Sequence, residues 1–266
     1  MNSGSQTSKW VCGLLGFCLL LLQACLPQAP PSQPQLSAKE VWQRFQTDAN
    51  ATTSPEGFWL KASLNYAGNQ GNHRIVFTMW GNYSRPVRMD LQAGIGTTFS
   101  LWRESETGWI AYYPGQEKAY THENGRRGAQ ALGLATPFDL QELSRVMTGR
   151  LTEIAPNSYR SATRTSQGTF HFTSPSGASI QTLEIAANGR VLAVTGTTPQ
   201  PWTLTFSDFP STKSAFAHKI TLEAGDAHKA VLRLKEVRWK ESGWDQSALQ
   251  LKLPPETLRL RLHSPS

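Results

Sequence analysis

Histidine and carboxylate side chains are the groups in this chain that could perform acid–base or metal chemistry. The six histidines are scattered along the sequence, at His73, His122, His171, His218, His228 and His263. None belongs to an HExxH or HxxH pair, and the sequence contains no G-x-S-x-G, P-loop or dinucleotide-binding motif. His122 adjoins Glu123 in the turn-like stretch "HENGRRG", where no third partner has a useful spacing. We therefore predict that the protein is not an enzyme and needs no metal or other cofactor.

The N-terminus has the pattern of a secretory signal sequence. Lys9 precedes an apolar run over 10–22 that is too short to span a bilayer comfortably, so residues 1–24 are predicted to be a signal peptide. The "LQAC" stretch over 22–25 resembles the lipobox of bacterial lipoproteins. This resemblance implies that Cys25 becomes an acylated N-terminus. The alternative is an ordinary signal peptide followed by a chance cysteine.

The other two cysteines, Cys12 and Cys18, lie inside the predicted signal peptide, which leaves Cys25 alone in the mature chain. An internal disulfide and a cysteine-based metal site are therefore excluded for the mature protein. In such lipoproteins, an aspartate directly after the cysteine favours retention in the inner membrane. This chain has Leu26 at that position. The resemblance therefore implies localisation to the periplasmic face of the outer membrane. Residues 25–35 are then a lipidated cysteine with a flexible Pro- and Gln-rich tether, "LPQAPPSQPQ". Residues 36–266 are predicted to form one domain.

The chain is basic, with 26 Lys and Arg against 19 Asp and Glu. The positive side chains are distributed along the sequence rather than gathered in one block. One interpretation is a surface that meets anionic lipid headgroups, and the other is a soluble basic domain with no such partner. A lipid-anchored, secreted chain has no access to nucleic acid, so a nucleic-acid partner is not expected.

Hydrophobic periodicity predicts a mainly β fold with helical inserts. An amphipathic helix is expected over 36–49, where Ser37 and Glu40 have capping-box spacing. A second helix is expected from Asp139 to Gly149, after a short Ala-rich segment. Period-two segments predict strands over 58–66, 74–83, 87–92, 97–104, 109–113 and 118–122, and again over 159–165, 169–174, 179–187, 190–197, 202–209, 218–224 and 230–239. The segment 253–262 is ambiguous between a terminal strand and a tail.

These elements predict an α+β architecture: a half-open antiparallel β-barrel of about 11–12 strands, covered by helices on its concave face. Two helices leave open what fills the interior of so large a sheet. With 9 Trp, 6 Tyr and 11 Phe, the filling is partly aromatic. A packed core and an apolar cavity for an acyl chain are both compatible with this composition.

The order of features resembles the LolA/LolB superfamily of lipoprotein carriers and outer-membrane acceptors. The resemblance runs through the stretches "RMDLQAGIGTTFSLWRESETGWIAYYPGQEKAY", "PFDLQELSRVMTGRL" and "LRLKEVRW", and covers most of residues 36–260. It implies an outer-membrane lipoprotein that accepts acylated lipoproteins from a LolA-like periplasmic carrier and helps to insert them into outer-membrane lipids, and we expect a monomer. The alternative is an envelope lipoprotein that binds another apolar ligand, or scaffolds a complex, without insertase activity.

The same resemblance implies roles for particular residues. Gly94, Ile95 and Gly96 fall on a protruding loop whose bulky aliphatic residue enters the membrane, whereas without the resemblance the favoured reading is that Ile95 packs inward onto the core. The residues implied to line an apolar cavity are Phe58, Leu60, Leu64, Ile75, Phe77, Met79, Leu143 and Met147. Because the strand register is not known from the sequence, the opposite set of Trp59, Trp80 and Trp102 stays open as the concave face.

Overall fold

The computed structural model describes residues 36–48, 55–68, 71–93, 96–132, 136–198, 200–212, 214–225 and 228–263. The chain divides into two compact units, Met1–Leu36 and Ser37–Ser266. The predicted signal peptide, Cys25 and the tether belong to the first unit and lie outside the described residues. Gly94 and Ile95 belong to the second unit and also lie outside the described residues. The sheet and its helices all belong to the second unit.

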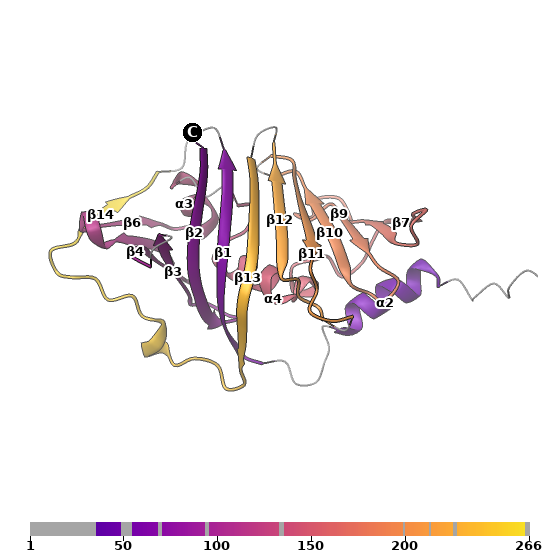
Figure 1. Ribbon diagram of the computed structural model, residues 1–266, viewed down its shortest axis with the longest axis horizontal. Helices are drawn as coiled ribbons and strands as arrows, with labels where there is room; N and C mark the ends of the chain where they lie inside the picture. Colours follow the sequence, from indigo (N-terminus) through magenta and orange to yellow (C-terminus); the bar gives the residue numbers. More distant parts are fainter. Residues whose placement is uncertain are drawn as a thin grey trace, which may run out of the picture. The chain divides into compact units, whose positions relative to one another are not determined.

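Fourteen strands of the described chain form a single sheet, in the order β14-β6-β5-β4-β3-β2-β1-β13-β12-β11-β10-β9-β8-β7 (Figure 1). The strands are β1 (Gly57–Gly68), β2 (Gly71–Asn82), β3 (Val87–Ala93), β4 (Thr98–Ser105), β5 (Gly108–Tyr113), β6 (Lys118–His122), β7 (Ser161–Arg164), β8 (Phe170–Thr173), β9 (Thr182–Ile185), β10 (Val191–Gly196), β11 (Trp202–Ser207), β12 (Lys219–Ala224), β13 (His228–Lys240) and β14 (Leu258–Arg261). The β14–β6 pair is parallel, whereas β1–β13 and β1–β2 are typical of the antiparallel rest.

The sheet is open, because β14 and β7 stand at the two ends of the strand order. The predicted class, a mainly β half-open sheet with helical inserts, is therefore confirmed. The strand number was underestimated, in part because the ambiguous C-terminal segment adds β14 to the edge strand β6. The strands form two runs along the chain, β1 to β6 and β7 to β13. The long strands β1 and β13 pair with each other and so join these two runs at the centre of the sheet.

Three α-helices form in the described chain: α2 (Ala38–Asp48), α3 (Gly125–Ala131) and α4 (Leu140–Thr148). The predicted capping box of α2 is present, because the Glu40 carboxylate accepts from the Ser37 backbone N–H at 2.7 Å. The Ala-rich segment forms α3. Short 3-10 turns occur at Pro114–Gln116, Leu151–Glu153 and Gln246–Leu249.

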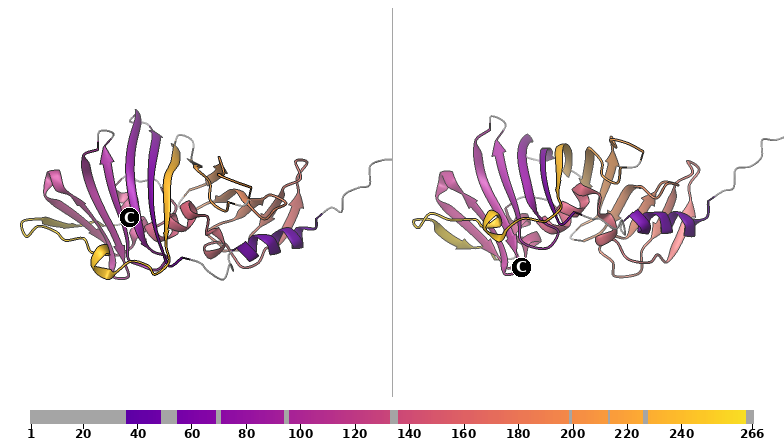
Figure 2. Two further views of the ribbon diagram at one scale, coloured as in Figure 1. Left: turned by 60° about the horizontal axis from the view of Figure 1, so that its bottom comes forward. Right: turned by 90° about the horizontal axis from the view of Figure 1, so that it is seen from below.

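The helices lie on the concave side of the curved sheet, as the views in Figure 2 show. α2 packs at the β7–β9 end, where the Trp42 ring lies 5.1 Å from that of Tyr159 and 5.0 Å from that of Phe172. α4 lies near the middle of the sheet and contributes the buried side chains of Val146 and Met147. Its apolar stripe is what the sequence periodicity predicts for a helix that covers a sheet.

The segment after β13 crosses the convex side of strands β1 to β4. The Trp80 indole donates to the Ala248 carbonyl at 3.3 Å, and the Arg103 side chain donates to the Leu249 carbonyl at 2.8 Å. The Leu249 side chain is fully buried. This segment therefore covers part of the convex face before the chain returns to the sheet edge as β14.

The register decides which face of each strand is concave. Leu64 pairs with Ile75, and Leu60 pairs with Met79, so these four side chains share the concave face. Trp59 pairs with Trp80 on the opposite face.

Trp102 belongs to the concave face, because it pairs with Met89, which in turn pairs with Met79. The grouping of Trp102 with Trp59 and Trp80 is therefore wrong. Alternation is visible within one strand, but the pairing of separate strands sets their relative phase.

Candidate apolar ligand cavity

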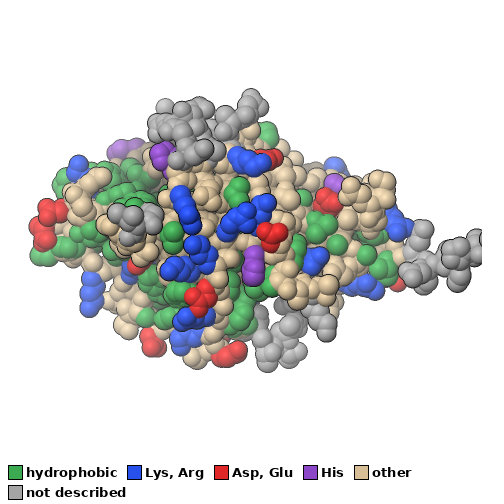
Figure 3. Space-filling model, in the orientation of Figure 1, with side chains coloured by type: hydrophobic (Ala, Val, Ile, Leu, Met, Phe, Trp, Pro, Cys, Tyr) green, Lys and Arg blue, Asp and Glu red, His purple; other side chains and the backbone are tan. Residues whose placement is uncertain are grey.

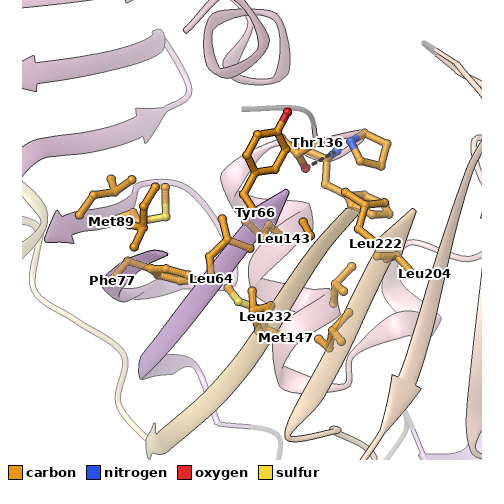
Figure 4. A pocket seen from close by; sticks show the side chains of 17 residues that line it. Leu64, Tyr66, Phe77, Met89, Thr136, Leu143, Met147, Leu204, Leu222 and Leu232 are labelled. Carbon is orange, nitrogen blue, oxygen red and sulfur yellow. Dashed lines mark hydrogen bonds between the residues drawn. The ribbon is translucent and has the colours of Figure 1, made fainter. Parts of the chain in front are cut away.

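An apolar cavity lies between the concave face of the sheet and α4 (Figure 4). Its empty volume is about 830 Å³, including the space at its open mouth. Its walls come from strands β1 to β3 and β11 to β13, from α4, and from the segment that precedes α4. The lining residues are Leu64, Tyr66, Ile75, Phe77, Met89, Leu91, Thr136, Pro137, Phe138, Leu143, Val146, Met147, Leu204, Ile220, Leu222, Ala230 and Leu232.

None of these lining residues carries a charge. The hydroxyl of Thr136 is engaged with the backbone of its own segment, since it accepts from the Phe138 N–H at 3.1 Å. Among the described residues, no group of three or more His, Cys, Asp or Glu side chains could hold a metal ion. A cavity with this lining can hold an aliphatic chain by burial alone, because the transfer of apolar surface out of water is favourable.

The resemblance implied that eight residues line the cavity, and the structure places only five of them there. Leu64, Ile75, Phe77, Leu143 and Met147 lie on the cavity wall. The other three, Phe58, Leu60 and Met79, are fully buried and do not line the cavity. They continue the same concave face toward the other end of β1 and β2, where Phe58 packs on the Tyr83 ring at 5.3 Å, so their expected place on the wall is corrected to the solid core.

Sequence reasoning missed the wall contributed by the second run of strands. Leu204, Ile220, Leu222 and Leu232 all line the cavity. Their period-two spacing could have marked them as one face of β11, β12 and β13. The missing information was that β13 pairs with β1, which brings both runs to one interior.

The N-terminus of α4 is anchored to the sheet by a buried carboxylate. Glu104 on β4 accepts from the Leu140 backbone N–H at 2.7 Å and from the Arg85 side chain at 3.0 Å. Arg85 also bridges to Asp139, the N-cap of α4, at 2.9 Å. These contacts fix the helix that carries Leu143 to the cavity, so the position of this wall depends on Glu104.

Burial raises the pKa of Glu104, and the nearby Asp139 charge adds to this rise, whereas hydrogen bonds from Leu140 and Arg85 offset part of it. Because the folded-state pKa exceeds the usual 4.5, the folded chain binds this proton more strongly than the unfolded chain between the two values. The contribution of Glu104 to the free energy of unfolding therefore falls as pH rises through this interval.

We expect this dependence to be absent from Glu104→Gln, which cannot ionise. In thermal unfolding, the Tm difference, wild type minus Glu104→Gln, should decrease as pH is raised from about 4.5 to about 7. Parallel Tm profiles for the two proteins would contradict this assignment.

The loop between β3 and β4 is closed at its base by two backbone hydrogen bonds. Ala93 N–H donates to the Thr97 carbonyl and Gly96 N–H donates to the Ala93 carbonyl, both at 2.9 Å. Gly96 is exposed, has φ of +91° and has open space where a Cβ would stand. The base of the loop is therefore closed at the sheet margin. Gly94 and Ile95 lie outside the described residues.

Comparison with known proteins gives a fold but no sequence relative. No protein-family model and no curated protein matches the sequence. Among solved structures, a LolA superfamily protein from Nitrosomonas europaea superposes with a TM-score of 0.55 and 7% identity, covering 81% of this chain and 98% of that chain. A DUF1329 family protein from Desulfovibrio piger gives a TM-score of 0.56 and 9% identity, covering 80% and 98%.

No helix among the described residues is long and apolar enough to cross a membrane. The open sheet, the helices on its concave side and the match over nearly the whole length of both solved structures lead to one conclusion. The protein has the same fold as the LolA superfamily protein from Nitrosomonas europaea.

Proposed function

We propose that this protein is an outer-membrane lipoprotein that receives the acyl chains of other lipoproteins in its cavity and passes them into the outer membrane. The observation that carries the proposal is the charge-free, apolar lining of the cavity beneath α4. An acyl chain needs apolar surroundings and no directional partner, which is what this lining offers. Such an exchange between two apolar environments needs no cofactor.

The proposal assigns Cys25 to lipid attachment and a LolA-like periplasmic carrier to the delivery of cargo. The lipobox-like "LQAC" supports the anchor, and the LolA-like fold supports the kind of cargo. Ile95 is assigned to membrane insertion, because it lies between Gly94 and Gly96 in the sequence, in the connection between β3 and β4 whose base is closed by backbone hydrogen bonds. Burial of one isoleucine contributes roughly 2 kcal/mol, which biases a tethered domain toward contact with the bilayer without anchoring it.

The test is the transfer of an acylated lipoprotein from its periplasmic carrier to liposomes, using residues 25–266 with Cys25→Ser. We expect Ile95→Asp to keep the Tm and to accept cargo normally, but to deliver it at least about tenfold more slowly, because a carboxylate cannot enter the bilayer at low cost. Ile95→Leu is the matched control and should deliver like wild type.

Two outcomes contradict the proposal in different ways. Normal delivery by Ile95→Asp would remove the loop from the mechanism. Failure of the wild-type protein to accept acylated cargo, together with tight binding of another apolar ligand, would favour the alternative of a binding lipoprotein without insertase activity.

A further inference from the structure

The convex face of the sheet carries an excess of positive charge. Strands β1, β2, β12 and β13 together contain eight Lys and Arg but only two carboxylates, Glu223 and Glu236. Figure 3 shows Lys and Arg gathered over these four strands. We name as the basic face the side chains of Lys61, Arg74, Lys219, Lys229, Arg233, Lys235 and Arg238.

Strand alternation turns these side chains away from the cavity. On β13, Leu232 lines the cavity, whereas its neighbour Arg233 is exposed. On β2, Ile75 lines the cavity and its neighbour Arg74 is exposed. Lys235 is the extra residue at the β1–β13 register shift and is exposed too. The basic face and the cavity therefore lie on opposite sides of the same strands.

Much of this charge is not neutralised by neighbours. Three cations of the basic face have a carboxylate partner, in the pairs Lys229–Glu223 at 2.7 Å, Arg238–Glu236 at 2.5 Å and Arg233–Asp208 at 3.6 Å. No carboxylate of the described chain lies within ion-pairing distance of Lys61, Arg74, Lys219 or Lys235. Structural ion pairing thus accounts for fewer than half of these side chains.

The C-terminal segment leaves the basic face open. Its hydrogen bonds to the convex side join it to Trp80, Asn82, Arg88 and Arg103, at one end of β2 and on β3 and β4. Among the seven cations, all except the half-buried Lys219 are exposed. A broad, exposed face with unpaired charge fits a broad, anionic partner.

We propose that the basic face docks on the anionic headgroups of a lipid bilayer. The cations are distributed over the four neighbouring strands β2, β1, β13 and β12, which suits a planar array of phosphates better than one small anion. This inference rests on the proposed function for the lipid anchor. Ten residues separate Cys25 from Leu36, so the acylated cysteine would hold the domain within about 35 Å of headgroups. Such a tether is long enough to let the basic face reach the headgroups, and electrostatic attraction acts once the separation falls to about one Debye length, roughly 8–10 Å.

Docking through the basic face has a consequence for cargo exchange. The cavity opens on the opposite side of the sheet, so a docked domain presents its cavity to the periplasm, where a carrier arrives. Delivery through the β3–β4 loop then requires the domain to leave this docked orientation. Salt and anionic lipid content would therefore change the balance between the receiving and the delivering orientation.

The test is flotation of residues 25–266, carrying Cys25→Ser, with vesicles of phosphatidylcholine alone or with about one third phosphatidylglycerol, at low and high salt. We expect binding only to the anionic vesicles, and less of it at high salt. Reversal of three charges, in Lys61→Glu/Arg74→Glu/Lys235→Glu, should weaken this binding at least about 20-fold. The matched control makes the same charge change elsewhere, in Lys39→Glu/Arg160→Glu/Arg259→Glu, and should stay within about threefold of wild type.

Equal weakening by both triple variants would overturn the proposal, because net charge would then account for the binding. Absence of vesicle binding together with salt-sensitive binding to poly-glutamate would also overturn it, in favour of an acidic protein partner. The assay uses no cargo, so a failure of the docking proposal can be told from a failure of lipoprotein transfer by Ile95→Asp. The Tm of each variant checks that its fold is intact.

Discussion

Leu222→Glu is expected to reduce the affinity for a fluorescent long-chain fatty acid by at least about 100-fold. Leu222 lines the cavity from β12 and is only half-buried, so in the empty protein the new carboxylate can stay hydrated. An acyl chain that fills the cavity would remove that water from the charge. The cost of an unpaired, dehydrated carboxylate is several kcal/mol, which exceeds what the remaining apolar contacts recover.

The matched control is Thr221→Glu, one residue earlier on β12. Thr221 pairs with Val231 and Thr205, and strand alternation directs its side chain to the convex face. Thr221→Glu places the same charge on the same strand but on the face opposite the cavity. The fatty-acid affinity should therefore stay within about threefold of wild type. Equal losses in the two variants would mean that charge acts at long range, and unchanged binding in Leu222→Glu would exclude this cavity as the binding site.

Gly149→Ala is expected to lower the free energy of unfolding by about 3 kcal/mol. Gly149 ends α4 with φ of +80°, a conformation that costs an alanine about 1 kcal/mol. In addition, a Cβ at this position would meet the backbone of Ala215 at 2.6 Å and that of Phe216 at 2.7 Å. Backbone atoms cannot rotate away as a side chain can, so the end of α4 must move, and with it the helix that closes the cavity.

Gly177→Ala is the control that separates the cost of the positive φ from the cost of the contact with the 215–216 backbone. Gly177 has φ of +86°, close to that of Gly149, but nothing lies within 4 Å of the position of its Cβ. We expect this variant to lose only the conformational part, about 1 kcal/mol in chemical denaturation. A loss for Gly149→Ala no greater than that for Gly177→Ala would show that the contact with the 215–216 backbone carries no energetic cost.

The local structure of this protein is largely determined by local sequence. The Asp139 N-cap is present as predicted, because its carboxylate accepts from the Glu142 backbone N–H at 2.8 Å. Gly149 ends the same helix in the left-handed conformation that glycine favours. Each of the predicted strands after residue 57 has a counterpart in the sheet, because period-two alternation and the turns between strands need no distant partner.

The cavity wall was only partly predictable, because it depends on contacts between distant segments. Leu64 and Leu60 are equivalent by alternation on β1, yet one lines the cavity and the other is enclosed in the core. Trp102 joined the concave face through its pairing with Met89, which no property of β4 alone specifies. Buried Glu104 is another such case: its partners Arg85 and Leu140 are 19 and 36 residues away in the sequence.

The sequence by itself determined the elements, their caps, the mainly β class and the alternation that gives every strand an apolar face. The tertiary structure decided that β1 pairs with β13, and thereby that both runs of strands share one interior with α4. It also decided that the cations of four strands form one face opposite the cavity. The physical reason is that periodicity fixes which side chains share a face within a strand, whereas the hydrogen-bonded register between strands fixes which of those faces meet.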